Sequence, residues 1–473
     1  MVEPTGQHGC PRCGRLRAEI EGLKSRLAAL EAELAKSRKH SGNSSKPPST
    51  DIVRPGATKS GKQGQGKKRK RGGQPGHPRH ERTPFTPDEI DYFWEWRYPA
   101  CPCCNGTLND APQQPAKTLQ QVEIQDKPTI VEEHAAITQW CPRCRKVFSP
   151  PFPDYLVKAG LVGPRLTALV GWFKSVCHMS FSSIRKFFRD VIGVRISRGM
   201  LRKVISKVTE SLKDPYEELL NLLAHEEQLN VDETGHKDCG KRLWTWCFRA
   251  YLYTVFKISP SRSSDMLVEV LGKEFNGVLG CDYFSAYRKY MKKFNVALQF
   301  CLAHLIRDYK FLAEHPDPKN REFGQRMLNQ FRKLFGIIHR REEYKSEETF
   351  QRALGKARDA LVWEATFESP HTAEASNLEE RFYLNTESYF RFITTPGVEP
   401  TNNLAEQAIR FVAIHRRLTQ GTRGVAGQKW VERVCTVIAT CTQQGRSSFH
   451  FLYDAVHSYF AGDPSPSLVP DTS

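Results

Sequence analysis

The first patterned stretch of the chain is a heptad repeat of apolar residues. Leucine and isoleucine recur at alternating spacings of four and three, with Glu, Lys and Arg between them. This spacing is typical of a helix that pairs with another helix. It predicts a short coiled coil within residues 1–36 and a dimer or higher oligomer, although an amphipathic helix packed on its own domain would give the same pattern. The repeat positions are Leu16, Ile20, Leu23, Leu27, Leu30 and Leu34.

Apolar periodicity disappears in residues 37–84, where Ser, Gly, Pro and Lys are abundant. A segment of this composition cannot bury a core, so we expect a linker that is disordered in isolation. Its run of cations, followed by Gly and Pro, resembles arms that enter the minor groove of DNA. A solvated linker attracted to phosphates is the alternative, and both interpretations predict DNA contact. The cations are Lys67, Lys68, Arg69, Lys70 and Arg71.

Paired cysteines indicate a zinc-binding module in residues 85–152. Two Cys-Pro-x-Cys turns each present two thiolates, as in a zinc ribbon, and Thr118–Trp140 alternates as its strands would. Disulfides are the alternative, which a reducing compartment disfavours. An earlier pair, Cys10 and Cys13, offers only two ligands, so it forms a half-site, a site shared between copies, or no site. The expected structural Zn²⁺ ligands are Cys101, Cys104, Cys141 and Cys144.

Helical spacing returns in residues 153–222. A basic helix over 182–189 is followed by a turn with Gly193 and by a second helix that begins after Ser197. This is the pattern of a helix-turn-helix, with Arg198 and Arg202 near the exposed start of the second helix. The pattern also occurs in ordinary helical domains, so the prediction is a helical DNA-binding domain that resembles a helix-turn-helix.

From Leu229 the pattern changes to apolar runs of strand length. One run ends at Asp232, and Gly277–Cys281 ends at Asp282. Leu243–Ile258 is rich in aromatic and β-branched residues, enough for two adjacent strands, and Val296–Phe300 forms a further one. With helices after the third and later strands, this order predicts a ribonuclease-H-like mixed sheet, by analogy of element order.

Acids at the ends of two such strands indicate a metal site. Mg²⁺ prefers oxygen ligands, and two ions about 3.5–4 Å apart can assist both the attacking and the leaving oxygen of phosphodiester transfer. We expect Asp232 to bridge two Mg²⁺ (or Mn²⁺) ions, with Asp282 and Glu406 each completing one. Strand-end aspartates are also common turn residues. With Asn403 as N-cap, Glu406 would occupy a capping-box position instead.

The surroundings of the third acid favour a functional site. Basic residues follow it on the same predicted helix, as suits a surface that holds a phosphate backbone: Arg410, Arg416 and Arg417. Glu399 and Asp308 are the rival third acids. The first core part would span 223–315, a helical insertion 316–396, the second part with C-terminal helices 397–460, and a tail 461–473.

Charge narrows the class of partner. The 473 residues carry a formal net charge of +18, with a pI of about 9.3. This predicts an acidic polymer, nucleic acid above all. An anionic membrane surface is the competing interpretation, but no long uninterrupted apolar run is present. The first residues lack a basic flank and an apolar core, so we expect a cytoplasmic protein with no membrane partner.

Several motifs together resemble the transposases of the insertion-sequence 66 group. They include Val231-Asp-Glu-Thr234, Asp282, Cys301-Leu-Ala-His304-Leu-Ile-Arg307 and Glu399-Pro-Thr-Asn-Asn-Leu-Ala-Glu406. The leucine seam, the Gly72-Gly-Gln-Pro-Gly-His77 motif and the paired cysteines follow the group's order, so the resemblance covers nearly the whole chain.

The resemblance implies a DDE transposase with a ribonuclease-H-like core and Mg²⁺ at Asp232, Asp282 and Glu406. It implies binding to element ends and target DNA, strand cleavage and 3′-hydroxyl strand transfer. Two small accessory proteins of the same element would be partners, in a bacterial, nucleoid-associated setting. His304 and Arg307 match an accessory pattern, and a helix-start histidine bonded to backbone is the alternative for His304. The alternative function is a catalytically inactive, zinc-containing DNA-binding regulator.

Overall fold

The computed structural model describes residues 11–40, 42–43, 83–109, 119–125 and 128–470. It divides the chain into two compact units, one formed by residues 1–56 and 135–473 and the other by residues 57–134. The predicted basic arm Lys67–Arg71 and the first cysteine of the early pair, Cys10, lie outside the described residues. No described helix combines the length and the apolar character that crossing a membrane requires.

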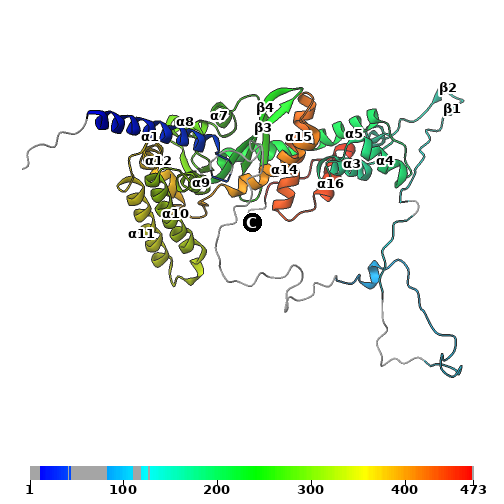
Figure 1. Ribbon diagram of the computed structural model, residues 1–473. Coiled ribbons are helices and arrows are strands. Elements are labelled where there is room, and N and C mark those ends of the chain that lie inside the picture. The colour runs from blue at the N-terminus through cyan, green and yellow to red at the C-terminus, as the bar shows by residue number, and fades with distance from the viewer. Residues whose placement is uncertain (1–10, 41, 44–82, 110–118, 126–127, 471–473) are drawn as a thin grey trace, which may run out of the picture. The chain divides into compact units, whose positions relative to one another are not determined.

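A five-stranded mixed sheet forms the centre of the larger unit (Figure 1). The strand order is β5-β4-β3-β6-β7; β3 pairs antiparallel with β4 and β4 with β5, whereas β3–β6 and β6–β7 are parallel. The predicted combination of helices with a mixed sheet is thereby confirmed. The strands are β3 (Gln228–Asp238), β4 (Lys241–Arg249), β5 (Thr254–Ser259), β6 (Val278–Cys281) and β7 (Ala297–Phe300).

Local sequence explains the antiparallel half of the sheet. Cys239 and Gly240 join β3 to β4 with positive φ angles of 49° and 83°, as a tight two-residue hairpin turn requires. Side chains of residues 228–234 in β3 alternate between partly exposed and buried positions, and the buried set consists of Leu229, Val231 and the charged Glu233. In β6 every residue is buried, as expected of a central parallel strand.

Helices from the C-terminal part of the chain pack on this sheet. Helix α14 (Asn403–Thr419) packs on β3 and β4, and α15 (Val425–Gln443) packs on β5. Three side chains of α15 accept hydrogen bonds from N–H groups of β5: Thr440 from Thr254 at 3.2 Å, Thr436 from Phe256 at 3.0 Å and Glu432 from Ile258 at 2.7 Å. These bonds satisfy backbone donors that an edge strand would otherwise leave unpaired.

The helical region before the sheet contains the two helices of the predicted helix-turn-helix. They are α4 (Phe181–Asp190) and α5 (Arg198–Ser211), and a separate cluster that includes Val170, Phe188 and Leu201 forms their core. Ser197 caps α5 by accepting a hydrogen bond from the Met200 N–H at 3.1 Å. The neighbouring helices are α2 (Asp154–Ala159), α3 (Pro164–Ser175) and α6 (Lys213–Leu222), and α16 (Ser448–Ala461) packs on α2, α3 and α5.

Helices also fill the chain between the last strand and α14. After α7 (Asp265–Leu271), α8 (Ser285–Phe294) and α9 (Leu302–Ala313), the chain forms α10 (Pro318–His339), α11 (Glu347–Thr366), α12 (Ala373–Leu384) and α13 (Thr386–Thr394). Helix α13 packs against β7, and α10 packs against both α9 and α11. The long first helix, α1 (Pro11–Ser37), bears the predicted leucine seam, whose six positions are between 49 and 63% exposed.

The region of the paired cysteines contains less strand than expected. Antiparallel β1 (Gln139–Cys141) and β2 (Lys146–Phe148) form a two-stranded hairpin. The described residues 119–125 and 128–138, which the alternating pattern predicted to be strands, have no strand structure. Their apolar side chains are exposed, including Val122, Ile130 and Val131, so no buried face enforces the alternation.

The contact of α9 with α10 predicts opposite effects for two glycines of one helix. A Cβ on Gly324 would lie 2.3 Å from the Ala313 backbone nitrogen, whereas one on Gly336 would meet only the Arg340 guanidinium at 3.9 Å. Gly324→Ala should therefore destabilise the protein by about 1–3 kcal/mol through overpacking. Gly336→Ala should stabilise it by about 0.5–1 kcal/mol through helix propensity. Thermal unfolding of the two variants measures the difference, and equal midpoints would contradict the close contact.

Candidate metal and catalytic site

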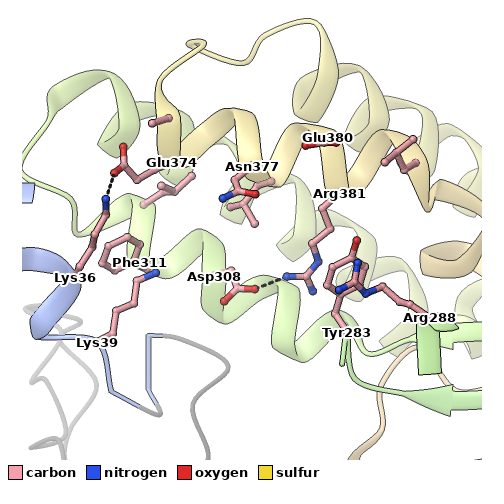
Figure 2. Close-up of a pocket in the computed structure, with 14 residues that line it drawn as sticks. Lys36, Lys39, Tyr283, Arg288, Asp308, Phe311, Glu374, Asn377, Glu380 and Arg381 are labelled. Carbon is pink, nitrogen blue, oxygen red and sulfur yellow. Dashed lines mark hydrogen bonds and ion pairs between the residues drawn. The ribbon is translucent and has the colours of Figure 1, made fainter. Parts of the chain in front are cut away.

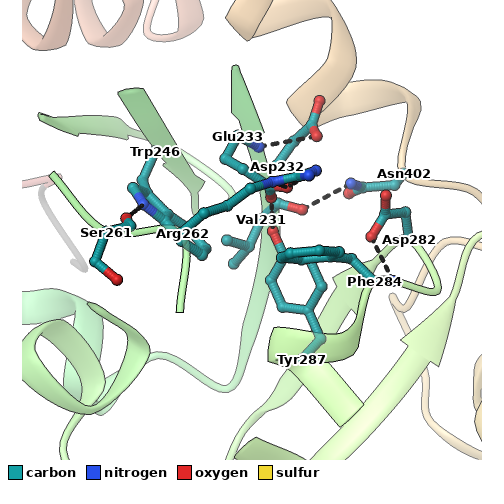
Figure 3. A network of polar contacts seen from close by, with 10 residues as sticks. All are labelled: Val231, Asp232, Glu233, Trp246, Ser261, Arg262, Asp282, Phe284, Tyr287 and Asn402. Atoms are coloured by element: carbon teal, nitrogen blue, oxygen red, sulfur yellow. Dashed lines mark hydrogen bonds and ion pairs between the residues drawn. The ribbon is translucent and has the colours of Figure 1, made fainter. Parts of the chain in front are cut away.

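Strand register brings the first two predicted acids together. In the parallel pair of β3 and β6, Asn230 lies opposite Gly280. Asp232 and Asp282 each follow two residues later, at the same level and on the same face, because side chains alternate along a strand. The Phe284 N–H donates to Asp282 Oδ1 at 2.9 Å, and the Glu233 N–H donates to Asp232 Oδ1 at 2.9 Å. Both carboxylates are thus oriented by backbone donors (Figure 3).

The third predicted acid is brought to this edge by Asn402. Its side-chain N–H donates to the Val231 carbonyl at 2.8 Å, and its side-chain oxygen accepts from Asn230 Nδ2 at 2.9 Å. Its backbone N–H donates to Cys301 Sγ at 3.1 Å. Asn402 therefore joins the start of α14 to β3 and to the end of β7. Glycine is required at position 280, because a Cβ there would lie 2.4 Å from Asn230 Nδ2.

The helix start differs from the one expected from sequence. The N-cap is Asn402, not Asn403, so Glu406 follows at the fourth helical position. The Asn402 side chain makes no capping hydrogen bond, because it is engaged by β3. Glu406 is therefore not at the third helical position, so the alternative that it serves as a capping-box residue is wrong.

The Glu406 carboxylate faces two side chains of α9. Oε1 lies 3.6 Å from His304 Nδ1, and Oε2 lies 3.7 Å from an Arg307 nitrogen. Burial and the neighbouring arginines lower the pKa of His304 to about 4, so its imidazole is neutral at neutral pH and forms no ion pair there. Within the described part of the chain, His304 Nδ1 and Glu406 Oε1 are both buried without a hydrogen-bond partner.

Cys301 completes a second set of metal-ligand atoms around Glu406. One ligand atom from each of Cys301, His304 and Glu406 lies within 4.8 Å of the others. Burial raises the pKa of the Cys301 thiol. Sulfur and imidazole nitrogen suit Zn²⁺ or a related transition metal better than Mg²⁺. Glu406 thus belongs to this mixed group, and its negative charge also helps to raise the pKa of Asp232.

Burial is the largest influence on the pKa values of Asp232 and Asp282, and repulsion between carboxylates comes second. Burial, followed by the negative charges of Glu233, Asp282 and Glu406, raises the pKa of Asp232 well above its usual value. Burial and Glu233 raise the pKa of Asp282 to about 6, although Arg262 and Arg381 oppose the shift. A divalent cation would offset the charges of Asp232 and Asp282, which the strand register places side by side. Among the described residues, the only set of three ligand atoms within 4.8 Å of one another is that of Cys301, His304 and Glu406, so the structure does not bring Glu406 into one ligand set with both aspartates.

A neighbouring network neutralises a fourth acid, Glu233. Its side chain is only 1% exposed, and Arg262 donates to its Oε1 at 2.8 and 2.5 Å. The Tyr287 hydroxyl donates to its Oε2. The Arg262 guanidinium lies over the rings of Phe284 and Trp244, 3.8 and 4.6 Å from their centroids. The Glu233 carboxylate is therefore paired with Arg262 and Tyr287 (Figure 3).

The rival third acids lie in other surroundings. Asp308 forms an ion pair with Arg381 at 2.7 Å, and Glu399 is exposed just before Pro400. Both remain weaker candidates than Glu406, because Glu406 contributes to the raised pKa of Asp232.

The predicted DNA-contacting arginines occupy three kinds of position. Arg198 and Arg202 are exposed on α5, and Arg410 and Arg417 are exposed on α14. Arg416 is partly buried and donates to the Thr234 hydroxyl at 3.1 Å, so it ties α14 to β3. A structural role for Arg416 was not foreseen from the sequence.

The two later cysteine pairs form matching turns. The Asn105 N–H donates to the Cys101 carbonyl and the Arg145 N–H to the Cys141 carbonyl, both at 2.8 Å, and both donor residues have left-handed backbones. Hydrogen bonds from the backbone and thiol of Cys104 lower the pKa of Cys101, and those of Cys144 lower that of Cys141. Each turn favours thiolates. The pairs belong to different compact units, so a shared four-thiolate site stays a prediction.

Sequence reasoning missed Asn402, Arg262 and Tyr287. Asn402 lies inside the motif around Glu406, and this position could have marked it as a candidate. Its hydrogen-bond partners on β3 could not be recognised from the sequence. Arg262, in a loop of serines, and Tyr287, in an ordinary amphipathic helix, carried no such signal.

Comparison with known protein families matches the part of the chain that contains the candidate acids. The sequence model described as "Transposase IS66 family" matches residues 159–429, which include all three acids, and that of a family of unknown function (DUF6444) matches residues 11–83. Three uncharacterized proteins of Sinorhizobium fredii are similar. Protein y4jD is 27% identical over 44% of this chain and 44% of its own length. Protein y4qI is 24% identical over 67% of this chain and 63% of its own length. Protein y4hP is 22% identical over 72% of this chain and 67% of its own length. The chain thus spans less than two thirds of the length of the first two.

Charge crowding predicts a pH-dependent stability difference. A raised carboxyl pKa contributes stability that is complete below about pH 4 and is lost as the pH rises through about 6 for Asp282. In chelator, Asp282→Asn should match wild type near pH 4 and be more stable by about 1–3 kcal/mol at pH 7.5. Thermal unfolding across this range is the measurement. Mg²⁺ should remove the advantage, and the exposed control Asp454→Asn should show none. A constant difference at all pH values would contradict the crowding.

Proposed function

Because the chain belongs to the IS66 transposase family, we propose that it is a DDE transposase whose metal-binding acids are Asp232, Asp282 and Glu406. Transposases are DNA-processing enzymes that use divalent metal ions, and the finer assignment of residues is our own. The observation that carries it is the register of β3 and β6, which sets Asp232 beside Asp282, with Glu406 close enough to raise the pKa of Asp232.

The strand order supports a ribonuclease-H-like core. Three antiparallel strands come first in the chain, and two parallel strands follow on the other side of β3, with helices between them. The first and fourth strands are neighbours in this order, so their carboxyl ends lie together. A helix from the end of the chain then brings the third acid. The order of these elements along the chain was expected from the apolar runs, and the fold was expected by analogy with that order.

The proposed reaction is hydrolysis of a DNA strand at the element end, followed by attack of the freed 3′-hydroxyl on target DNA. When bound by the three carboxylates, divalent cations would activate the attacking oxygen and stabilise charge on the leaving oxygen. Asn402 fixes the helix that carries Glu406. Arg262 and Tyr287 keep the Glu233 charge paired, so it does not compete for the cations. His304 and Arg307 face the Glu406 carboxylate from α9 at 3.6 and 3.7 Å.

Exposed arginines supply the expected contacts with the substrate. Arg410 lies one helical turn after Glu406, where it would contact a phosphate next to the site, and Arg198 and Arg202 would contact DNA from α5. We also propose that two copies pair through α1, because its leucine seam is about half exposed on the single chain. Accessory proteins of the same element are expected partners on the family resemblance.

The proposal predicts a separation of cleavage from binding. Asp232→Asn should reduce Mg²⁺-dependent nicking of element-end DNA by about 10³-fold, equivalent to several kcal/mol of barrier, because a ligand oxygen is lost. Its affinity for the same DNA in chelator should stay within about twofold of wild type. Glu399→Gln, at an exposed acid of the same motif, is the control and should nick normally. If wild-type protein binds element ends but does not nick them in the presence of any divalent cation, the result would instead favour the inactive regulator.

The cysteine turns predict a structural zinc ion. Zinc analysis of the purified protein should find about one Zn²⁺ per chain, and a strong chelator should make residues 101–144 more sensitive to protease while the core resists. Cys104→Ser should mimic the chelator. Cys177→Ser, at another exposed cysteine, should retain zinc and protease resistance. Equal protease resistance of residues 101–144 with and without zinc would contradict the proposal.

A further inference from the structure

Helix α8, which begins three residues after Asp282, has one strongly basic face. Arg288 and Lys292 lie one turn apart, as do Lys289 and Lys293, so the four cations form a stripe beside Ser285. This α8 basic face lines a shallow hollow with no acid among its lining residues. The opposite face, with Tyr287 and Tyr290, is buried in the core.

The charge of this face is unbalanced. Among the residues that the structure describes, none of its four cations forms an ion pair with a carboxylate, although many surface arginines elsewhere do, such as Arg326 with Glu364 at 2.6 Å. Like charges one turn apart destabilise a helix. The helix dipole favours cations in the last turn, which accounts for Lys292 and Lys293 but not for Arg288 and Lys289. An external polyanion would compensate the whole stripe.

Arg288 connects the face to the acids. Its guanidinium lies 4.3 Å from the ring centroid of Tyr283, the residue directly after Asp282, and Arg381 lies over the same ring at 4.0 Å. Arg288 also lines a cleft of about 640 Å³ that extends to Lys36 and Lys39 at the end of α1 (Figure 2). Asp308 in this cleft is already paired with Arg381. The cleft has mixed charge, because Glu374 and Glu380 also line it and Lys36 forms an ion pair with Glu374 at 3.1 Å, so the uncompensated cations are those of α8 itself.

We propose that the α8 basic face binds the phosphate backbone of double-stranded DNA and guides it to Asp282. The proposal rests on the transposase function for the identity of the polyanion. Successive cation pairs lie about 6 Å apart along the helix axis, so they can neutralise neighbouring phosphates. The contacts are to phosphates, so the face contributes affinity and orientation but no sequence preference. The rigid packing of the tyrosine side of α8 fixes the direction of the bound strand relative to the acids.

The test is the salt dependence of DNA binding in chelator, where no cleavage occurs. Lys289→Gln, Lys292→Gln and Lys293→Gln are combined in one variant. The control combines Lys213→Gln, Lys319→Gln and Lys356→Gln, which remove the same charge from exposed positions of α6, α10 and α11. The slope of log affinity against log salt should decrease by about 2–3 in the α8 variant and by less than about 1 in the control. The loss should be equal for element-end and random DNA.

Folding is checked by thermal unfolding, where the α8 variant should have a midpoint close to that of wild type, because the removal of like-charge repulsion offsets the loss of two cations from the last helical turn. An unchanged slope, or an equal decrease in the control, would overturn the proposal. A loss confined to element-end DNA would do so too, because it would indicate base recognition. Failure of the proposed function gives a different result. If wild-type protein never nicks DNA but the slope is still reduced in the α8 variant, the transposase activity is rejected and DNA binding by α8 is retained.

Discussion

The hydrogen bonds of Asn402 are the contacts on which the site depends. One side chain reaches the Val231 carbonyl and Asn230 on β3, while its backbone N–H reaches the sulfur at the end of β7. Asn402 lies 171 residues after Val231 in the chain and 101 residues after Cys301. Because these bonds are short-range and directional, they fix where α14 begins and hence where Glu406 lies. The helix is placed by the sheet more than by its own sequence.

The same site has an electrostatic cost. Asp232 and Asp282 are buried close to Glu233, and burial first, followed by the neighbouring negative charges, raises the pKa values of both aspartates. The chain relieves one of these charges internally, by pairing Glu233 with Arg262 and Tyr287. It leaves the aspartates without a cationic side chain of their own in hydrogen-bond contact among the described residues. Glu233 therefore stabilises the fold, whereas Asp232 and Asp282 remain available to a ligand.

Much of the sheet could be predicted from sequence, because apolar runs bounded by polar turns report strands directly. The two aspartates were recognisable since each ends such a run, and parallel neighbours bring strand ends together. Partners distant in sequence could not be found this way. Asn402 was mistaken for a residue before the cap, because the pattern Asn-Asn allows either position, and only contact with Val231 decides between them. The alternation of residues 118–140 misled for the opposite reason: β-branched residues favour strands only where a face is buried.

Placement of the third acid far along the chain has a consequence for synthesis. Asp282 is made 124 residues before Glu406, with six helices, α8 to α13, in between. At about 5–20 residues per second, a ribosome needs roughly 6–25 s to cover that distance. During this interval the nascent chain already has its zinc-type turns and the α5 arginines, but not its full set of carboxylates. A growing polypeptide of this design therefore presents the arginines of α5 well before the last of its three candidate acids has been made.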